Sequence, residues 1–160
     1  MQSEEAGFTK AVICRIKAPL LLNIFKVIIF LKVREYTVCF LLGAVGYGLA
    51  EVLFRGYTHW TMLVAGGVVM TLFCHINKTE NLNIFLKCLT GALVVTSIEL
   101  AFGLIVNVRL GWGVWDYSDK PFNLFGQICP LFSLAWFFIS FVGFRLCDTV
   151  AKRFSYLPAM

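Results

Sequence analysis

Two carboxylates lie inside long apolar runs of the sequence, where an ionisable side chain is costly and usually needs a partner. The first belongs to the pattern Gly43-x-x-x-Tyr47-x-x-x-Glu51-x-x-x-Arg55. Steps of four residues place side chains on one face of a helix, so Arg55 follows Glu51 by one turn and can pair with it. We expect this face to be buried against another helix.

The second carboxylate lies on a face of small residues, Gly91-x-x-x-Val95-x-x-x-Glu99-x-x-x-Gly103. Small residues at this spacing let two membrane helices approach closely, so Glu99 should also be buried against a neighbouring helix. We predict that its run crosses the membrane in the same direction as the run that holds Glu51. The two carboxylates then share a depth in the outer half of the protein.

More polar and aromatic residues follow just beyond that end, from the close of the third run to the start of the fourth. We expect Asn123 to be the N-cap of the last helix. Pro130 should leave a backbone carbonyl without its donor inside that helix, and Gln127 is placed to donate a hydrogen bond to it. Aromatic residues at this level are also typical of the interfacial belt. The candidate substrate-binding residues are therefore Glu51, Arg55, Glu99, Arg109, Trp115, Asp116, Tyr117, Asn123 and Gln127.

Three interpretations of these residues stay open. They could line an outward-open polar pocket for an ion, a proton or a small polar solute. They could serve an intramembrane enzyme that acts on a lipid headgroup, with carboxylates as acid and base and with Arg55 and Arg109 holding phosphate. They could also form only an ion-pair lattice, Glu51 with Arg55 and Glu99 with Arg109, in a structural or chaperone-like subunit.

The sequence gives no sign of a catalytic residue, a metal site or a cofactor. It has no phosphate-binding G-x-x-x-x-G-K-[ST] loop, so nucleotide hydrolysis would need a separate ATPase subunit. No Ser or Cys nucleophile has a neighbouring base, and the six cysteines lack metal-ligand spacing, which makes them small packing residues. We lean away from an enzyme and expect no cofactor and no metal.

The elements that position these residues are predicted to be membrane helices. The chain has 160 residues, of which 59% are apolar and only 14% are charged, whereas a water-soluble domain carries about 25% charged residues. Strict period-two alternation, typical of a membrane barrel, is absent. We predict an all-α, polytopic helical bundle over residues 36–147, with four spans at about 36–54, 60–76, 85–106 and 125–146.

Residues 1–35 form a basic N-terminal segment that is harder to interpret. Its apolar stretch from Ala18 to Leu31 contains Lys26 and is shorter than the ~20 residues that a span needs. We expect an interfacial, in-plane helix here, with a fifth, tilted span as the alternative. Residues 148–160 are predicted to be a cytoplasmic tail.

The distribution of Lys and Arg predicts that both termini lie in the cytoplasm. Eleven of the 14 cationic residues then fall in inner segments, and only Arg55, Arg109 and Lys120 fall in outer ones. The net charge of +5 is thus explained by topology and by attraction to anionic lipid. We predict the lipid bilayer as a partner and no nucleic acid.

Part of the chain resembles a known family of small bacterial membrane proteins. The run VWDYSDKPFNLFGQIC at 114–129 and the FSLAW motif at 132–136 are similar to the "Putative ABC-transporter type IV", or permease, family. The pieces Tyr47-Gly48-x-x-Glu51-x-x-x-Arg55 and Glu99-x-x-x-Gly103 add to the likeness, which covers about residues 40–140.

The resemblance implies a multi-pass protein of the bacterial cytoplasmic membrane. It also implies that transport would need an ATPase partner, or a homo-oligomer, to supply what one small chain lacks. The predicted cytoplasmic loop from about Asn77 to Phe85 is short for the coupling helix that such a partner would contact. We therefore expect a permease-like or transporter-accessory subunit.

Overall fold

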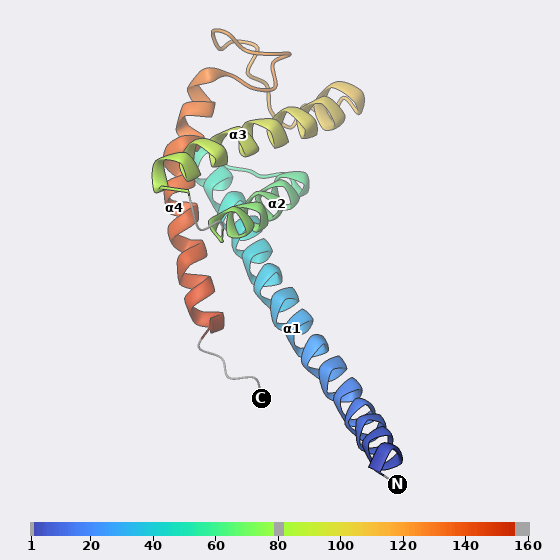
Figure 1. Cartoon of the computed structure of the whole chain (residues 1–160). Helices are drawn as coiled ribbons and strands as arrows, with labels where there is room; N and C mark the ends of the chain where they lie inside the picture. Colours follow the sequence, from blue (N-terminus) through green and yellow to red (C-terminus); the bar gives the residue numbers. More distant parts are fainter. Residues whose placement is uncertain (1, 79–81, 156–160) are drawn as a thin grey trace.

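The computed structural model describes the backbone of residues 2–78 and 82–155, and the side chains of residues 26, 29, 30, 32–78 and 82–154. Its helices are α1 (Gln2–Arg55), α2 (Trp60–Asn77), α3 (Ile84–Gly103), the π-helix η1 (Leu104–Arg109) and α4 (Pro130–Ser155) (Figure 1). Within the described residues there is no β-strand. The predicted all-α class is confirmed.

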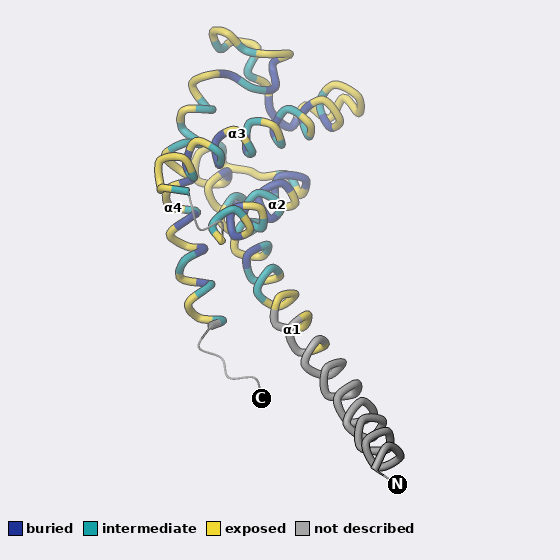
Figure 2. The backbone as a smooth tube through the Cα atoms, in the orientation of Figure 1, coloured by how far each residue is buried: buried dark blue, intermediate teal, exposed yellow. Residues whose placement is uncertain are grey.

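Four helical segments are long and apolar enough to cross a membrane. They are Lys32–Arg55, Trp60–Asn77, Ile84–Arg109 and Pro130–Phe154. Exposed residues recur along all four, and buried residues alternate with them (Figure 2). An apolar helix surface that no other protein element covers is what a membrane helix presents to lipid. The four predicted spans are therefore confirmed as apolar helices.

The N-terminal segment does not form a helix of its own. The backbone is helical without a break from Gln2 to Arg55, 54 residues, so the segment continues directly into the first span. The side chains of residues 1–25, on which the expected interfacial contacts depend, lie outside the described residues. The prediction of a separate helix before the first span is not confirmed.

The last helix begins at Pro130, five residues later than predicted. A proline in the first turn of a helix leaves no intrahelical hydrogen bond unmade, because the first backbone N–H groups have no partner there. The prediction that Pro130 leaves an unpaired carbonyl inside the helix, to be satisfied by Gln127, is therefore wrong. Residues 110–129 instead form a folded segment, which we call the outer loop after the side of the membrane on which the sequence predicts it.

A short turn joins α1 to α2, whereas η1 and the outer loop join α3 to α4, and the four helices thus form two hairpins. Gly56 ends α1 in a left-handed conformation with φ of 78°, and its N–H donates to the Val52 carbonyl at 2.9 Å. Glycine adopts this conformation readily, which explains the sharp turn. The Asn83 side chain caps α3 by accepting from the Leu86 N–H at 2.9 Å. Figure 1 shows the outer loop at the end of the bundle opposite the α4 C-terminus.

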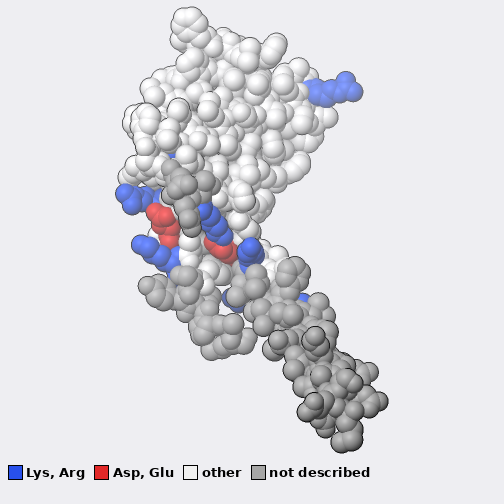
Figure 3. Space-filling view, in the orientation of Figure 1, with Lys and Arg blue, Asp and Glu red and all other residues white. Residues whose placement is uncertain are grey.

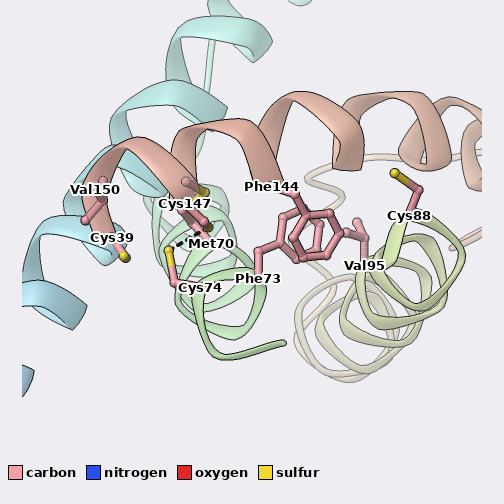
Figure 4. Packing of buried hydrophobic residues seen from close by; sticks show 9 residues of the cluster. All are labelled: Cys39, Met70, Phe73, Cys74, Cys88, Val95, Phe144, Cys147 and Val150. Carbon is pink, nitrogen blue, oxygen red and sulfur yellow. Dashed lines mark hydrogen bonds between the residues drawn. The ribbon is translucent and has the colours of Figure 1, made fainter. Parts of the chain in front are cut away.

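The main core lies where α1, α2, α3 and α4 meet, and within it Phe73 and Phe144 stack with ring centroids 4.8 Å apart (Figure 4). Four cysteines surround this pair as small buried side chains, in line with the packing role that we predicted. A fifth, Cys129, is buried at the end of the outer loop. All five described cysteines are free thiols, namely Cys39, Cys74, Cys88, Cys129 and Cys147.

Charged residues gather at the end of the bundle away from the outer loop. On the face seen in Figure 3 they form a belt next to the region left undescribed, while the bundle above is almost uncharged. Lys78 pairs with Glu35 at 2.9 Å and lies over the Tyr36 ring. Asn77 donates to Asp148 at 2.6 Å, which ties α2 to α4 at this end.

Candidate functional site

Glu51 lies near the C-terminal end of α1 and is only 8% exposed. Its Oε1 accepts from Arg55 at 2.8 Å, and its Oε2 accepts from the Thr58 hydroxyl at 2.6 Å. The predicted pair of Glu51 with Arg55 is thus confirmed. Thr58, which the sequence did not single out, satisfies the second carboxylate oxygen.

Arg55 also connects the first hairpin to the outer loop. One of its guanidinium nitrogens donates to the Tyr57 hydroxyl at 2.9 Å and to the backbone carbonyl of Val114. The guanidinium lies 4.8 Å from the centre of the Tyr57 ring. With Glu51 as a further acceptor, three of the five N–H donors of Arg55 are engaged inside the protein. Arg55 thereby holds the outer loop against the end of α1.

Glu99 is 5% exposed and lies on the buried face of α3 that the small-residue pattern predicted. Its Oε2 accepts from the Trp136 indole N–H at 2.7 Å, which links α3 to α4. Its Oε1 has no hydrogen-bond partner among the described residues. The Trp136 ring in turn stacks on Tyr47 of α1, with centroids 5.8 Å apart and planes at 22°.

The pair of Glu99 with Arg109, which the ion-pair lattice interpretation required, does not form among the described residues. Arg109 ends η1 as an exposed side chain, ten residues after Glu99. Ten helical residues correspond to a rise of about 15 Å, which is longer than an arginine side chain. Arg109 makes no ion pair with any described residue.

A polar network from η1 holds the outer loop. Asn107 accepts from the Val114 N–H at 2.7 Å and donates both to the Trp115 carbonyl at 2.9 Å and to Gln127 Oε1 at 2.7 Å. The Trp115 indole donates to the Gln127 carbonyl at 3.0 Å. Trp115 and Gln127 are each 5% exposed. Gln127 therefore fixes the loop, and Asn107 is a central residue of the loop that sequence reasoning missed.

Asp116 and Asn123 shape turns within the loop. Asp116 Oδ1 accepts from both the N–H and the hydroxyl of Ser118, and these hydrogen bonds lower the pKa of the Asp116 carboxyl. Asn123 accepts from the Gly126 N–H at 3.0 Å and donates to the Lys120 carbonyl at 2.9 Å. The prediction that Asn123 caps the last helix is wrong, because that helix begins seven residues later.

Tyr117 lies between the loop and the helices. Its ring stacks on Phe132 of α4 with centroids 4.5 Å apart. Burial raises the pKa of the Tyr117 hydroxyl well above its ordinary value, and the nearby Glu99 carboxylate adds to this shift. The neutral phenol is therefore the form present at physiological pH.

These residues surround a cavity of about 740 Å³. Its walls come from α1, α2, α4 and the outer loop, with Val95 from α3, and most of the lining is apolar. Five predicted site residues line it, whereas Glu99 lies behind Trp136, and Arg109, Asn123 and Gln127 are not in its wall. Tyr47 and Trp136 are lining residues that we did not predict. The predicted residues in the wall are Glu51, Arg55, Trp115, Asp116 and Tyr117.

Four helices long and apolar enough to cross a membrane, with two buried carboxylates and a folded loop over a cavity, fit a small helical membrane protein. The chain belongs to the "Putative ABC-transporter type IV" family, whose model matches residues 49–159. This match confirms the family that the Trp-Asp-Tyr-Ser run suggested, and it extends beyond the expected residues 40–140 at the C-terminal side. The family and the helices together fit a membrane protein related to transport. No solved structure matches the chain.

Proposed function

We propose that this protein is a permease-like or transporter-accessory subunit of a bacterial cytoplasmic membrane, and that a solute binds in the cavity beneath the outer loop. The observation that carries this proposal is the cavity itself, which ends in the ion pair of Glu51 with Arg55. Its volume falls within the range of about 300–1,000 Å³ typical of small-molecule sites. A cluster that served only as an ion-pair lattice would need no such space.

The lining residues divide into two roles. Glu51, Trp115, Asp116 and Tyr117 face the solute, while Arg55 positions the loop through its hydrogen bond to the Val114 carbonyl. The energy for transport comes from a separate ATPase subunit, since the sequence holds no phosphate-binding loop. The ABC-transporter family favours this arrangement.

Both termini are proposed to face the cytoplasm, with the outer loop on the opposite side. The concentration of charged residues away from that loop supports this orientation. Cysteine substitutions in a Cys14→Ser background test it, because the other five native thiols are buried. A membrane-impermeant maleimide should label Asp119→Cys in intact cells and Lys152→Cys only after permeabilisation. The reverse pattern would overturn the orientation.

The transport role is tested by narrowing the cavity. A Cβ at Gly46, a lining residue of α1, would have no atom within 4 Å, so Gly46→Phe can fill space without a backbone clash. Ala101→Phe adds the same bulk at an exposed position of α3 that does not line the cavity. The tagged full-length chain, purified from its own membranes, should retain an ATP-hydrolysing subunit.

We expect Gly46→Phe to keep that subunit bound and to change its hydrolysis rate, whereas Ala101→Phe should change neither. ATP hydrolysis no higher than in an untagged control preparation would refute the ATPase-coupled role. Equal rates for the wild type and Gly46→Phe would refute the cavity as the coupled site.

A further inference from the structure

We propose that the occupant of the cavity is an amphipathic organic cation, whose charged group lies against Asp116 and the aromatic wall and whose apolar part lies between α1 and α4. This inference rests on the proposal that the cavity is a solute site, and it names the chemical class of that solute.

The charge of the lining favours a cation. Glu51 and Asp116 are the carboxylates of the wall and Arg55 is its guanidinium, which leaves a net charge of −1. Three of the five N–H donors of Arg55 are engaged, by Glu51, Tyr57 and the Val114 carbonyl. An anionic group in the cavity would therefore meet carboxylates before it met a free positive donor.

Asp116 offers the available acceptor. Both hydrogen bonds from Ser118 go to Oδ1, and no other described residue donates to Oδ2. The two oxygens of Glu51 are already engaged by Arg55 and Thr58. A cationic group that lies near Asp116 would pair with a carboxylate oxygen without breaking a contact of the protein.

Aromatic side chains form the second half of the cation site. Tyr47 and Trp136 both line the cavity, and Tyr117 lines it beside them while stacking on Phe132. Aromatic faces attract ammonium groups through the ring quadrupole, most strongly where water is excluded. A wall of several rings next to carboxylates is the combination that recognises organic cations and distinguishes them from metal ions, which prefer oxygen and nitrogen ligands.

The rest of the cavity suits an apolar group. Val69, Met70 and Phe73 form its wall on α2. On the α4 side, Ile139, Val142 and Leu146 line the cavity and are also exposed on the outer surface of the helices. The cavity is thus continuous with the lipid-facing surface of α1 and α4. A solute with an apolar part can reach it from the bilayer, where such molecules concentrate.

A pair of ions with similar size and opposite charge tests the inference. The purified full-length chain in nanodiscs of neutral lipid is titrated with tetraphenylphosphonium and, separately, with tetraphenylborate, and binding to empty nanodiscs is subtracted. We expect saturable binding of the cation and at least roughly tenfold weaker binding of the anion, a difference set by cation–π attraction and the carboxylates. The measurement needs no ATPase, so its result is independent of the coupling test above.

Matched variants assign the binding to the cavity. Asp116→Asn should weaken cation binding by roughly fivefold to tenfold, the order expected for one partly solvated charge contact. Asp119→Asn removes a carboxylate from the same loop that pairs with Lys120 outside the cavity, and it should leave binding unchanged. Tyr47→Leu should weaken binding, while Tyr47→Phe, which keeps the ring, should not.

Two results would overturn the inference. One is equal binding of tetraphenylborate and tetraphenylphosphonium, which would show that the cavity selects apolar bulk alone. The other is an equal effect of Asp116→Asn and Asp119→Asn, which would assign the electrostatic attraction to the loop as a whole. Both aspartates are exposed, so their amide variants should fold and keep the comparison valid.

Discussion

The hydrogen bond between Trp136 and Glu99 connects a side chain of the cavity wall to a buried carboxylate behind it. Replacement of Trp136 by Phe removes the indole N–H that donates to Glu99 Oε2 at 2.7 Å. Because Oε1 already lacks a partner among the described residues, the variant leaves neither oxygen of this 5% exposed side chain with a protein hydrogen bond. The aromatic ring that stacks on Tyr47 is retained.

The expected cost follows from burial. The loss of a partner that leaves a buried acceptor unsatisfied costs about 1–3 kcal/mol, and Glu99 falls in the upper part of this range because its other oxygen also lacks a partner among the described residues. Trp136→Phe should therefore lower the free energy of unfolding by about 2–3 kcal/mol. In a Glu99→Leu background no carboxylate remains to be satisfied, so the same replacement should cost less by about 1.5–3 kcal/mol.

The measurement is a double-mutant cycle of unfolding by dodecyl sulfate in mixed micelles, followed by far-ultraviolet circular dichroism. Tryptophan fluorescence is unsuitable because the variant removes a tryptophan. Trp112→Phe is the matched control, since Trp112 is 47% exposed and an exposed replacement usually changes stability by less than about 0.5 kcal/mol. A coupling between Trp136 and Glu99 below about 0.5 kcal/mol would refute the reasoning.

Three further predictions concern helix packing, the loop network and pH. A Cβ at Gly91 would lie 2.6 Å from the Ser140 hydroxyl oxygen of α4, so Gly91→Ala should lower the free energy of unfolding by about 1–3 kcal/mol. Gly46→Ala, which meets no atom within 4 Å, should leave that free energy unchanged or raise it by up to about 1 kcal/mol. Equal effects of the two variants in the unfolding assay would contradict this prediction. Asn107→Ala removes three hydrogen bonds and should cost about 2–4 kcal/mol, seen as faster proteolysis of the outer loop. Hydrogen bonds from Ser118 lower the pKa of Asp116 in the folded loop, so the charged Asp116 stabilises the loop above the ordinary carboxyl pKa, and this stabilisation is lost as pH falls through the lower folded pKa. Proteolysis of the outer loop should therefore become faster between about pH 5 and about pH 3. The increase should be smaller in Ser118→Ala.

The buried faces of α1 and α3 could be predicted because they depend on local spacing. Four-residue steps fix which side chains share a helix face, and an ionisable group in an apolar run must turn inward. The pair of Glu51 with Arg55 follows from the same rule. Glu99 was correctly expected to be buried, but its partner Trp136 was not predicted, since Trp136 lies 37 residues away and no local pattern indicates that contact.

The outer loop was harder to predict because its order comes from contacts between distant residues. Asn107 looks like an ordinary polar residue at the end of a span, yet it holds Val114, Trp115 and Gln127 at once. The start of the last helix was misplaced because apolar residues continue upstream of Pro130. Those residues include Phe125, which has a left-handed φ of 54° that a helix cannot accommodate.

The cavity lies where the α1–α2 hairpin meets the α3–α4 hairpin, and few polar contacts cross this boundary. At the outer end, Arg55 of the first hairpin donates to the Val114 carbonyl of the second. Deeper in the bundle, the Tyr47 ring stacks on Trp136, which Glu99 orients. Because both contacts lie at the cavity wall, a relative movement of the hairpins would change the volume of the cavity and the position of its carboxylates together. Under the proposed function, the ion pair of Glu51 with Arg55 would link a bound solute to the arrangement of the two hairpins.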